Sequence, residues 1–186
     1  MSSRRIHTKE DSVTMIDRWN IIYQRRQNVF KYGDDVTYKL GMDFLSDCKT
    51  VEDWGCGSTY SKKFCKSESY IGIDGSYNVN ADKQADLATY ESAPDGIFMR
   101  HVLEHNYDWR PIIANAMKSF KRKMALIIFT PFSERERLIY VNQRGIPIVS
   151  LPWDEFESYF KSLKWRCEVV KSHTQYHHEF IYYIEK

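Results

Sequence analysis

A glycine-containing segment and a second acid 21 residues later are the first residues in this sequence that could do chemistry. Asp53, Gly55 and Gly57 fit a strand that turns sharply into a helix, and the glycines leave the backbone of the turn bare for a ligand. Asp74 ends a second short apolar run, where nucleoside-binding α/β domains place the acid that accepts hydrogen bonds from ribose hydroxyls. Together these residues predict a nucleoside pocket.

A missing glycine in this segment narrows the choice of nucleoside cofactor. The dinucleotide fingerprint G-x-G-x-x-G needs its third glycine at position 60, where the chain has Tyr60, so an NAD site is disfavoured. The segment instead resembles the first motif of the class I S-adenosylmethionine-dependent methyltransferases, an acid followed by G-x-G and a small residue. In this chain the motif is formed by Asp53, Gly55, Gly57 and Thr59, with threonine where glycine is commoner.

The resemblance extends to two later motifs of that family. Ala85-Asp86-Leu87 resembles its third motif, in which an acid meets the adenine amino group; Asp86 could otherwise be a solvated acid in a loop. The segment from Asp95 to His105 resembles its fourth motif, an aspartate-led strand that ends in V-L-E-H. The resemblance therefore implies S-adenosyl-L-methionine as the cofactor. The residues that it implies for cofactor binding are Asp53, Gly55, Cys56, Gly57, Asp74, Gly75, Asp86, Leu87 and His101.

Three titratable side chains, His101, Glu104 and His105, follow the apolar run of that fourth motif and are the candidate catalytic residues. They lie at the carboxyl edge, where open α/β sheets bind ligands. Methyl transfer from a sulfonium is an in-line displacement, so a base is needed only if the acceptor must lose a proton. His105 suits a hydroxyl acceptor, because a neutral imidazole can take a proton near physiological pH. In the resembled family the same segment also has other roles, including packing beside the cofactor.

The order H-x-x-E-H at residues 101–105 also raises the question of a metal site. Some RNA-terminal members of the family use a related E-x-x-E-H segment with a further histidine, and His173, His177 and His178 lie downstream. Here the first position is a histidine instead of an acid, and a zincin would need H-E-x-x-H on a helix. We therefore expect no metal, and a polar hairpin turn at residues 176–178.

Missing motifs and the charge balance narrow the class of molecule that could accept the methyl group. The chain has no N/D-P-P-Y/F segment and no Pro-Cys pair after that strand, and its net charge of +2 comes without a basic stripe. We therefore expect methyl transfer to a hydroxyl of a small molecule, sugar or glycan, with nucleic acid unsupported but not excluded. Four aromatic side chains could line such a pocket or pack in the core: Trp109, Phe132, Tyr140 and Trp153.

Other functions remain open. Methylation of RNA would show as a salt-sensitive affinity for RNA, and methylation of a protein belongs to the same alternative. A methyltransferase-like module that has lost turnover would act through a partner, and Thr59 in the glycine loop keeps this alternative open. An NAD-dependent reductase is the least favoured because of Tyr60.

The elements that must position these residues form an α/β fold over residues 34–186. The resemblance implies a three-layer sandwich, Rossmann-like, around a mostly parallel seven-stranded sheet whose last strand pair is antiparallel. Strands are predicted at 50–54, 70–73, from 95, 124–130, 165–170 and 180–184, and helices at 36–45, 58–66, 111–120 and 153–163. Asp108 is expected to cap the third helix. The connection at 132–152 is long enough to be a cover on the substrate side.

Residues 1–33 are predicted to form an N-terminal helical extension. From Ser12 onward, Val13, Ile16, Trp19 and Tyr23 recur on one helical face. In the resembled family such an extension tends to fold over the cofactor, so this segment is a possible lid; the alternative is a surface helix that packs Trp19 into the core. Residues 1–12 are polar and expected to be frayed.

The composition fits a single globular domain of 186 residues. The four cysteines include no C-x-x-C pair and are typical of reduced cytosolic thiols. No apolar run approaches the roughly 18 to 20 residues that span a bilayer, and the polar start lacks a signal core. We therefore expect a cytoplasmic protein with no membrane partner; the sequence does not indicate its oligomeric state.

Overall fold

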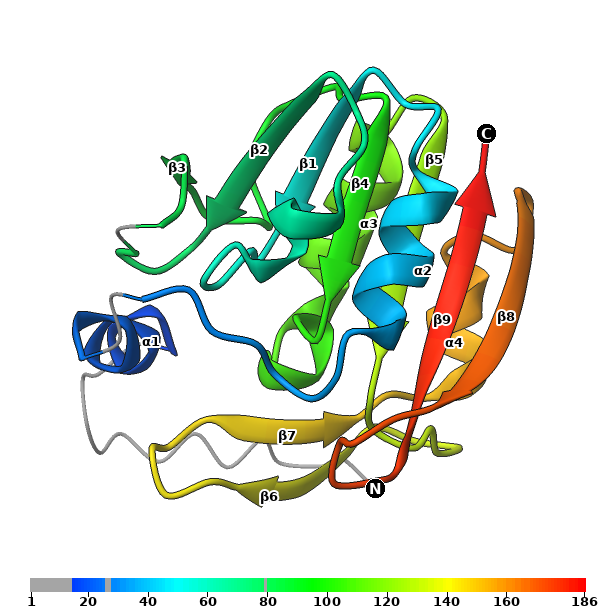
Figure 1. Ribbon diagram of the computed structural model, residues 1–186. Helices are drawn as coiled ribbons and strands as arrows, with labels where there is room; N and C mark the ends of the chain where they lie inside the picture. Colours follow the sequence, from blue (N-terminus) through cyan, green and yellow to red (C-terminus); the bar gives the residue numbers. More distant parts are fainter. Residues whose placement is uncertain (1–14, 26–27, 79) are drawn as a thin grey trace.

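The computed structural model describes residues 15–25, 28–78 and 80–186, and a seven-stranded sheet runs through the centre of the fold (Figure 1). The strand order is β3-β2-β1-β4-β5-β9-β8. The first five strands in this order are parallel, whereas β9 is antiparallel to both β5 and β8, which confirms the predicted sheet. The strands are β1 (Thr50–Trp54), β2 (Ser69–Asp74), β3 (Lys83–Gln84), β4 (Gly96–Arg100), β5 (Lys123–Ile128), β8 (Lys164–Lys171) and β9 (His178–Glu185).

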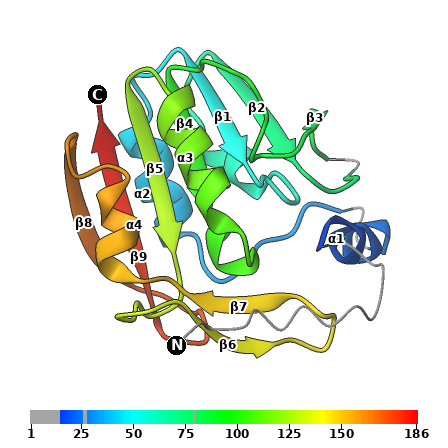
Figure 2. The same ribbon diagram turned by 180° about the vertical axis from the view of Figure 1, so that it is seen from behind.

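Helices cover both faces of the sheet and complete three layers. Figures 1 and 2 show α2 on one face and α3 and α4 on the other. A short 3-10 helix, η1, packs beside α2, with the rings of Tyr38 and Tyr60 5.2 Å apart. These elements are α2 (Val36–Phe44), η1 (Tyr60–Phe64), α3 (Trp109–Ser119) and α4 (Trp153–Ser158).

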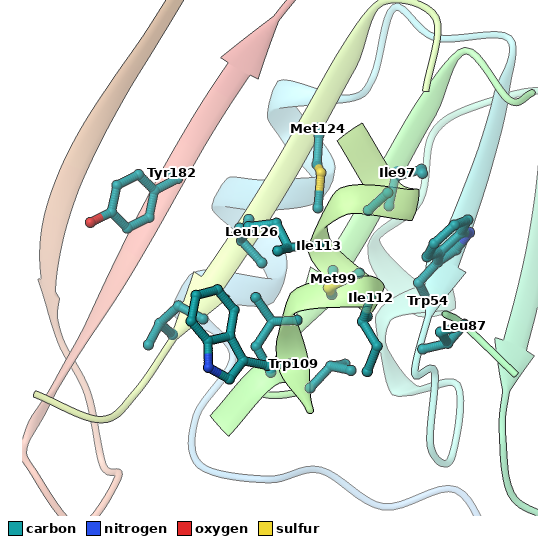
Figure 3. Packing of buried hydrophobic residues seen from close by; sticks show 14 of the residues in the cluster. Trp54, Leu87, Ile97, Met99, Trp109, Ile112, Ile113, Met124, Leu126 and Tyr182 are labelled. Carbon is teal, nitrogen blue, oxygen red and sulfur yellow. The ribbon is translucent and has the colours of Figure 1, made fainter. Parts of the chain in front are cut away.

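The central strands are buried on both faces, and their side chains alternate between two apolar clusters. Ile97 and Met99 of β4 belong to the cluster that α3 covers with Ile112 and Ile113 (Figure 3), whereas Phe98 belongs to the cluster under α2. This alternation is the period of two that a strand imposes. Burial on both faces explains why these strands read as nearly continuous apolar runs.

The helix expected at residues 58–66 is wrong in kind and length. The segment forms only the 3-10 helix η1, and Thr59 before it has a left-handed backbone with a φ of 59° that a continuing α-helix cannot hold. Ser61 donates its hydroxyl to the carboxylate of Asp53, and Ser58 exchanges hydrogen bonds with the backbone of Phe30. Polar side chains that bond elsewhere in this way disfavour a regular helix.

Two other helix predictions need correction. α4 ends at Ser158 instead of 163, because the chain turns through short-range hydrogen bonds from Phe160 to Glu157 and from Leu163 to Phe160. Asp108 occupies the position before α3, but its side chain makes no capping hydrogen bond. The predicted start of the first helix at residues 12–14, like the frayed end at 1–12, lies outside the described residues.

Two elements lie across the carboxyl ends of the parallel strands (Figures 1 and 2). One is α1 (Met15–Gln24), from the N-terminal extension. The other is a hairpin of β6 (Arg137–Val141) and β7 (Pro147–Ser150), which occupies the long connection between β5 and α4. The connection therefore carries structure of its own at the edge where a ligand is expected.

Gly41 of α2 sets the distance between that helix and the sheet. A Cβ at this position would lie 2.6 Å from Cε2 of the buried Phe98 ring, so Gly41→Val should lower the free energy of unfolding by about 1 to 3 kcal/mol through overpacking. Chemical denaturation measures the effect. Lys39→Ala, on the exposed side of the same helix, is the matched control and should change stability by less than about 0.5 kcal/mol. Equal effects of the two changes would contradict this account of the packing.

Candidate functional site

A cavity of about 380 Å³ lies at the carboxyl edge of the sheet. Its walls come from the loops after β1, β2 and β4, from α1, and from the β6–β7 hairpin. The volume is at the lower end of the range for small-molecule sites, which is about 300 to 1,000 Å³. The cavity therefore lies where the sequence predicted the nucleoside pocket.

The loop after β1 approaches the cavity with a bare backbone. Gly55 and Gly57 have φ angles of 75° and 52°, which glycine adopts readily. A Cβ at Gly55 would lie 2.3 Å from Val102, and one at Gly57 would lie 2.8 Å from the hydroxyl of Tyr23. The amide of Gly57 donates to Oδ2 of Asp74 at 2.9 Å, which fixes the loop against the end of β2. Both glycines are thus required by conformation and by close approach.

Two buried acids stand behind this loop and line the cavity. Oδ1 of Asp74 accepts hydrogen bonds from the amide and the hydroxyl of Ser76 at 2.9 Å and 2.5 Å. Asp53 accepts from Tyr70 at 2.7 Å and from Ser61. Burial raises the pKa of Asp74 and raises that of Asp53 to about 6, although the hydrogen bonds to each carboxylate oppose the shift. The structure therefore brings both predicted acids to the cavity.

The other residues implied for cofactor binding also line the cavity, but they differ in burial and in their contacts. Leu87 is buried there, whereas Asp86 is exposed and uses Oδ1 to accept from the amide of Ala88. The nearest atom to a Cβ at Gly75 would be 3.7 Å away, so space does not require glycine there. Burial raises the pKa of the Cys56 thiol far above its usual range, which makes that thiol inert.

His105 faces the cavity as a neutral imidazole with one nitrogen available. Its Nδ1 lies 3.1 Å from the carbonyl oxygen of Pro147, which can only accept, so Nδ1 carries the proton and Nε2 is left as an acceptor. The rings of Trp19 and Phe129 lie 5.5 Å from the imidazole on centroids. Burial lowers the pKa of His105 to about 4, against the smaller effect of the Pro147 hydrogen bond. This geometry suits a proton acceptor that is neutral at physiological pH.

His101 contacts a buried ion pair, Arg100 with Glu179, that no motif in the sequence indicated. Its Nε2 lies 2.5 Å from Oε1 of Glu179, and Nη2 of Arg100 lies 2.7 Å from the same oxygen. Arg100 also donates to Thr37 and to the hydroxyl of Tyr38, each at 3.0 Å. Burial and the charge of Arg100 lower the pKa of His101 to about 3, so it is a neutral donor to an ionised Glu179. Burial opposes ionisation of Glu179, but its two partners outweigh that effect and lower its pKa to about 2.

The expected catalytic role of Glu104 needs correction. Its side chain is completely buried and does not line the cavity. Oε1 accepts from the backbone amide of Phe129 at 2.8 Å, and Oε2 has no hydrogen-bond partner among the described residues. Burial raises the pKa of Glu104 to about 8. Glu104 is therefore hydrogen-bonded to the backbone of Phe129, whose ring contacts the rings of both His101 and His105.

The downstream histidines do not join the pair at the end of β4. His173 is exposed and pairs with Asp34, with 3.2 Å between Nδ1 and Oδ2. His177 lies in the turn before β9, with a φ of 60°. In the ranges that the structure describes, no group of three or more His, Cys, Asp or Glu side chains is arranged to hold a metal ion.

Of the four aromatic residues considered for the pocket wall, Tyr140 alone lines the cavity. Trp109, the first residue of α3, is fully buried, and Phe132 and Trp153 pack against each other with ring centroids 4.7 Å apart. The other aromatic side chains of the wall come from α1, α2, η1, β4 and two loops. The members of the wall are Trp19, Tyr23, Tyr32, Tyr38, Tyr60, Phe98, Phe129 and Tyr140.

Comparison with known proteins bears on the fold. No family model matches the sequence, and no curated protein matches it. The structure is similar to 1,6-didemethyltoxoflavin-N1-methyltransferase of Burkholderia thailandensis, which was solved with 1,6-didemethyltoxoflavin and S-adenosylhomocysteine. The TM-score is 0.67 at 13% sequence identity, and the match covers 92% of this chain and 87% of that one. It is also similar to magnesium protoporphyrin IX methyltransferase from Synechocystis PCC 6803 with bound S-adenosylmethionine, with a TM-score of 0.61 at 14% identity over 98% and 100% of the two chains.

A third similar structure is the N-methyltransferase NodS from Bradyrhizobium japonicum WM9 in complex with S-adenosylhomocysteine. The TM-score is 0.62 at 11% identity, and the match covers 91% of this chain and 99% of that one. The chain therefore has the class I, Rossmann-like methyltransferase fold, as the sequence motifs predicted. A membrane-crossing helix, which would have to be long and apolar, is absent from the residues that the structure describes.

Replacing Glu104 should make stability less sensitive to pH. Because the folded carboxyl has a pKa of about 8 against 4.5 for the free side chain, the folded state keeps a proton that the unfolded state loses. The free energy of unfolding of the wild type should therefore fall as the pH rises through this window, by up to about 1.4 kcal/mol per pH unit, and Glu104→Gln should remove that contribution. Denaturant unfolding at about pH 5 and about pH 8 measures the difference. The exposed Glu134→Gln is the control; parallel profiles for Glu104→Gln and the wild type would contradict the assignment.

His105 should remain neutral well below the usual range of histidine. Its folded pKa of about 4 against 6.5 means that the unfolded state binds the proton first as the pH falls, so this residue should destabilise the fold below about pH 6.5. Ring nitrogen chemical shifts followed by NMR report both the pKa and the tautomer, with His105→Gln identifying the signal. Protonation near 6.5, or a proton on Nε2 in the neutral form, would show that the Pro147 contact is wrong.

Proposed function

We propose that the protein is an S-adenosylmethionine-dependent methyltransferase and that this cavity is its active site. The observation that carries the proposal is the convergence of Gly57, Asp74 and His105 on one cavity at the carboxyl edge of a methyltransferase-like sheet. Gly57 and Asp74 suit binding of the nucleoside, and His105 suits deprotonation of the acceptor. The three similar structures contain S-adenosylmethionine or S-adenosylhomocysteine, which supports the choice of cofactor.

The residues of the inner part of the cavity fit this cofactor. Asp74 would hold the ribose hydroxyls, because a carboxylate has acceptor positions beyond those used by Gly57 and Ser76. Leu87 and Asp86 would lie beside the adenine, and the bare glycine loop with Cys56 and Gly75 would admit the rest of the nucleoside and the amino-acid part. When bound, the cofactor supplies a methyl group on a positively charged sulfur, and the acids of this region suit a cation.

A hydroxyl of a small molecule or sugar is the acceptor that the site fits best. Nε2 of His105 would take the hydroxyl proton, while the Pro147 carbonyl accepts a hydrogen bond from Nδ1–H and stabilises the imidazolium that forms. Burial makes His105 a weak base, since its pKa is about 4. Positioning of the acceptor and exclusion of water would therefore contribute more to the rate than proton transfer does. His101, fixed by Glu179, would position the cofactor side of the site.

Residues 1–33 would act as a lid on the domain formed by 34–186. The described part of this extension, α1, places Trp19 against His105 and the hydroxyl of Tyr23 over Gly57. The amide of Tyr77, in the loop after β2, donates to Oδ1 of Asn20, which ties α1 to the nucleoside side. Together with the β6–β7 hairpin, α1 would keep water from the reacting groups.

A module that binds the cofactor without turnover is the second candidate. Tyr23 lies close above Gly57, and Thr59 holds a left-handed backbone that is unusual for a β-branched residue. The Tyr23 hydroxyl would restrict the space over the glycine loop. Methylation of RNA or protein has no comparable support, because the wall of the cavity is closed by α1 and the hairpin and the net charge is only +2.

Calorimetric titration with S-adenosylmethionine, S-adenosylhomocysteine and NAD tests the proposal. We expect micromolar binding of the two sulfur nucleosides and none of NAD. Asp74→Ala should weaken binding by about 1 to 3 kcal/mol, because a charged acceptor for the ribose is lost. The exposed Asp43→Ala, which removes only a surface ion pair with Lys66, is the control and should bind like the wild type.

The outcomes of these titrations, together with a methyl-transfer assay, distinguish the methyltransferase from the module without turnover. Binding of both nucleosides without any transfer of a labelled methyl group to a pool of small hydroxylated molecules would favour the module without turnover. Failure of both nucleosides to bind a folded protein would exclude the methyltransferase and the module alike. An unchanged affinity in Asp74→Ala would place the ribose elsewhere.

A further inference from the structure

The charges that line the cavity are divided between its two ends. The three acids all lie on the nucleoside side: Asp53 near the end of β1, Asp74 at the end of β2, and Asp86 shortly after β3. Two arginines also line the cavity: Arg100 at the end of β4, and Arg144 in the turn of the β6–β7 hairpin. The guanidinium of Arg100 is neutralised by Glu179 at 2.7 Å. Arg144 has no ion-pair partner among the residues that the structure describes, so it leaves the acceptor side with an uncompensated positive charge.

Arg144 sits in a turn whose shape is fixed by its neighbours. Oδ1 of Asn142 accepts from the amides of Arg144 and Ile146 at 2.9 Å and 3.1 Å, and the amide of Gly145 donates to the Asn142 carbonyl at 2.8 Å. Gly145 supplies the positive φ of 77° that the turn needs. The backbone that carries Arg144 is therefore ordered at the rim of the cavity, where Asn142 also lines the wall.

A second arginine reaches the same turn from α1. Nη1 of Arg18 lies 1.6 Å from the position that a Cβ of Gly145 would take, so the guanidinium packs directly on the residue next to Arg144. Neither arginine pairs with a carboxylate in the described part of the chain. The turn therefore carries two positive charges without a carboxylate partner among the described residues, which favours an anion beside it.

We propose that the methyl acceptor carries an anionic group, a carboxylate or a phosphate, which Arg144 binds at the outer end of the cavity and which Arg18, packed on the same turn, helps to hold. This inference rests on the proposed function, since it identifies the substrate class of the same site. The anion sits on the hairpin side, and the reacting hydroxyl points inward to Nε2 of His105. Guanidinium groups are suited to this role because their donors match the oxygens of a carboxylate or a phosphate in pairs.

The positions of the two arginines also link binding of the acceptor to closure of the cavity by α1 and the hairpin. Arg18 belongs to α1 and Arg144 to the hairpin, so an anion held by both joins the two covering elements. A neutral acceptor of the same size would leave Arg144 and Arg18 without an anion to bind. The site therefore selects for the anion, and not only for the shape of the acceptor.

The test uses the full-length protein, with and without saturating S-adenosylhomocysteine, titrated with inorganic phosphate and separately with acetate at constant ionic strength. Binding is followed through the side-chain Nε–Hε signals of the arginines in NMR. We expect saturable binding of at least one anion with a Kd below about 10 mM, weakened at least about fivefold by Arg144→Gln and by Arg18→Gln. Arg137→Gln is the matched control, because Arg137 is exposed on the same hairpin and does not line the cavity.

Phosphate binding without acetate binding would identify a phosphate ester as the source of the anion, and the reverse would identify a carboxylate. An equal loss of affinity in Arg137→Gln and Arg144→Gln, or no saturable binding of either anion, would overturn the inference. If S-adenosylhomocysteine binds and neither anion does, this inference fails and the proposed function stands. If an anion binds through Arg144 and S-adenosylhomocysteine does not bind, the anion site stands and the proposed function fails.

Discussion

The buried ion pair between Arg100 and Glu179 is the interaction on which the carboxyl edge of this sheet depends. It joins the end of β4 to β9 across β5, and the same guanidinium reaches α2 through Thr37 and Tyr38. A further donor of Arg100 reaches the carbonyl of Tyr32, in the segment that leads from α1 to α2. Breaking one partner of such a pair leaves an uncompensated buried charge, which typically costs about 3 to 5 kcal/mol. The pair therefore holds together the strand that carries the candidate catalytic residues and the segment that leads to the lid.

Most of the sheet could be predicted because its signal is local. Apolar runs such as residues 97–99 and 124–128 are short and continuous, and the family resemblance implied the kind of sheet that such strands form. The helix expected at 58–66 was wrong because its polar residues bond to distant partners, Asp53 and the backbone of Phe30. Such contacts depend on the tertiary structure, which a local pattern does not contain.

The same limit applies to the site. The acids and glycines of the nucleoside side were found because the fold fixes their spacing in the sequence, and the cavity contains all of them. Glu179 was missed because it lies 78 residues from His101 in the sequence. It directly follows His177 and His178, which were the residues considered there, as possible metal ligands. Glu104 looked like a catalytic acid in V-L-E-H, yet its side chain turns into the core. The roles of His105 as base and of α1 as lid remain proposals with a geometry that now supports them.

The most direct test of the central claim is a crystal structure of the full-length protein grown with saturating S-adenosylhomocysteine. The account predicts the nucleoside in the cavity, with its ribose hydroxyls on Asp74, its adenine beside Leu87 and its sulfur on the side of the glycine loop that faces His105. A nucleoside bound elsewhere, or a cavity in which Tyr23 still lies over Gly57 with no nucleoside, would contradict it.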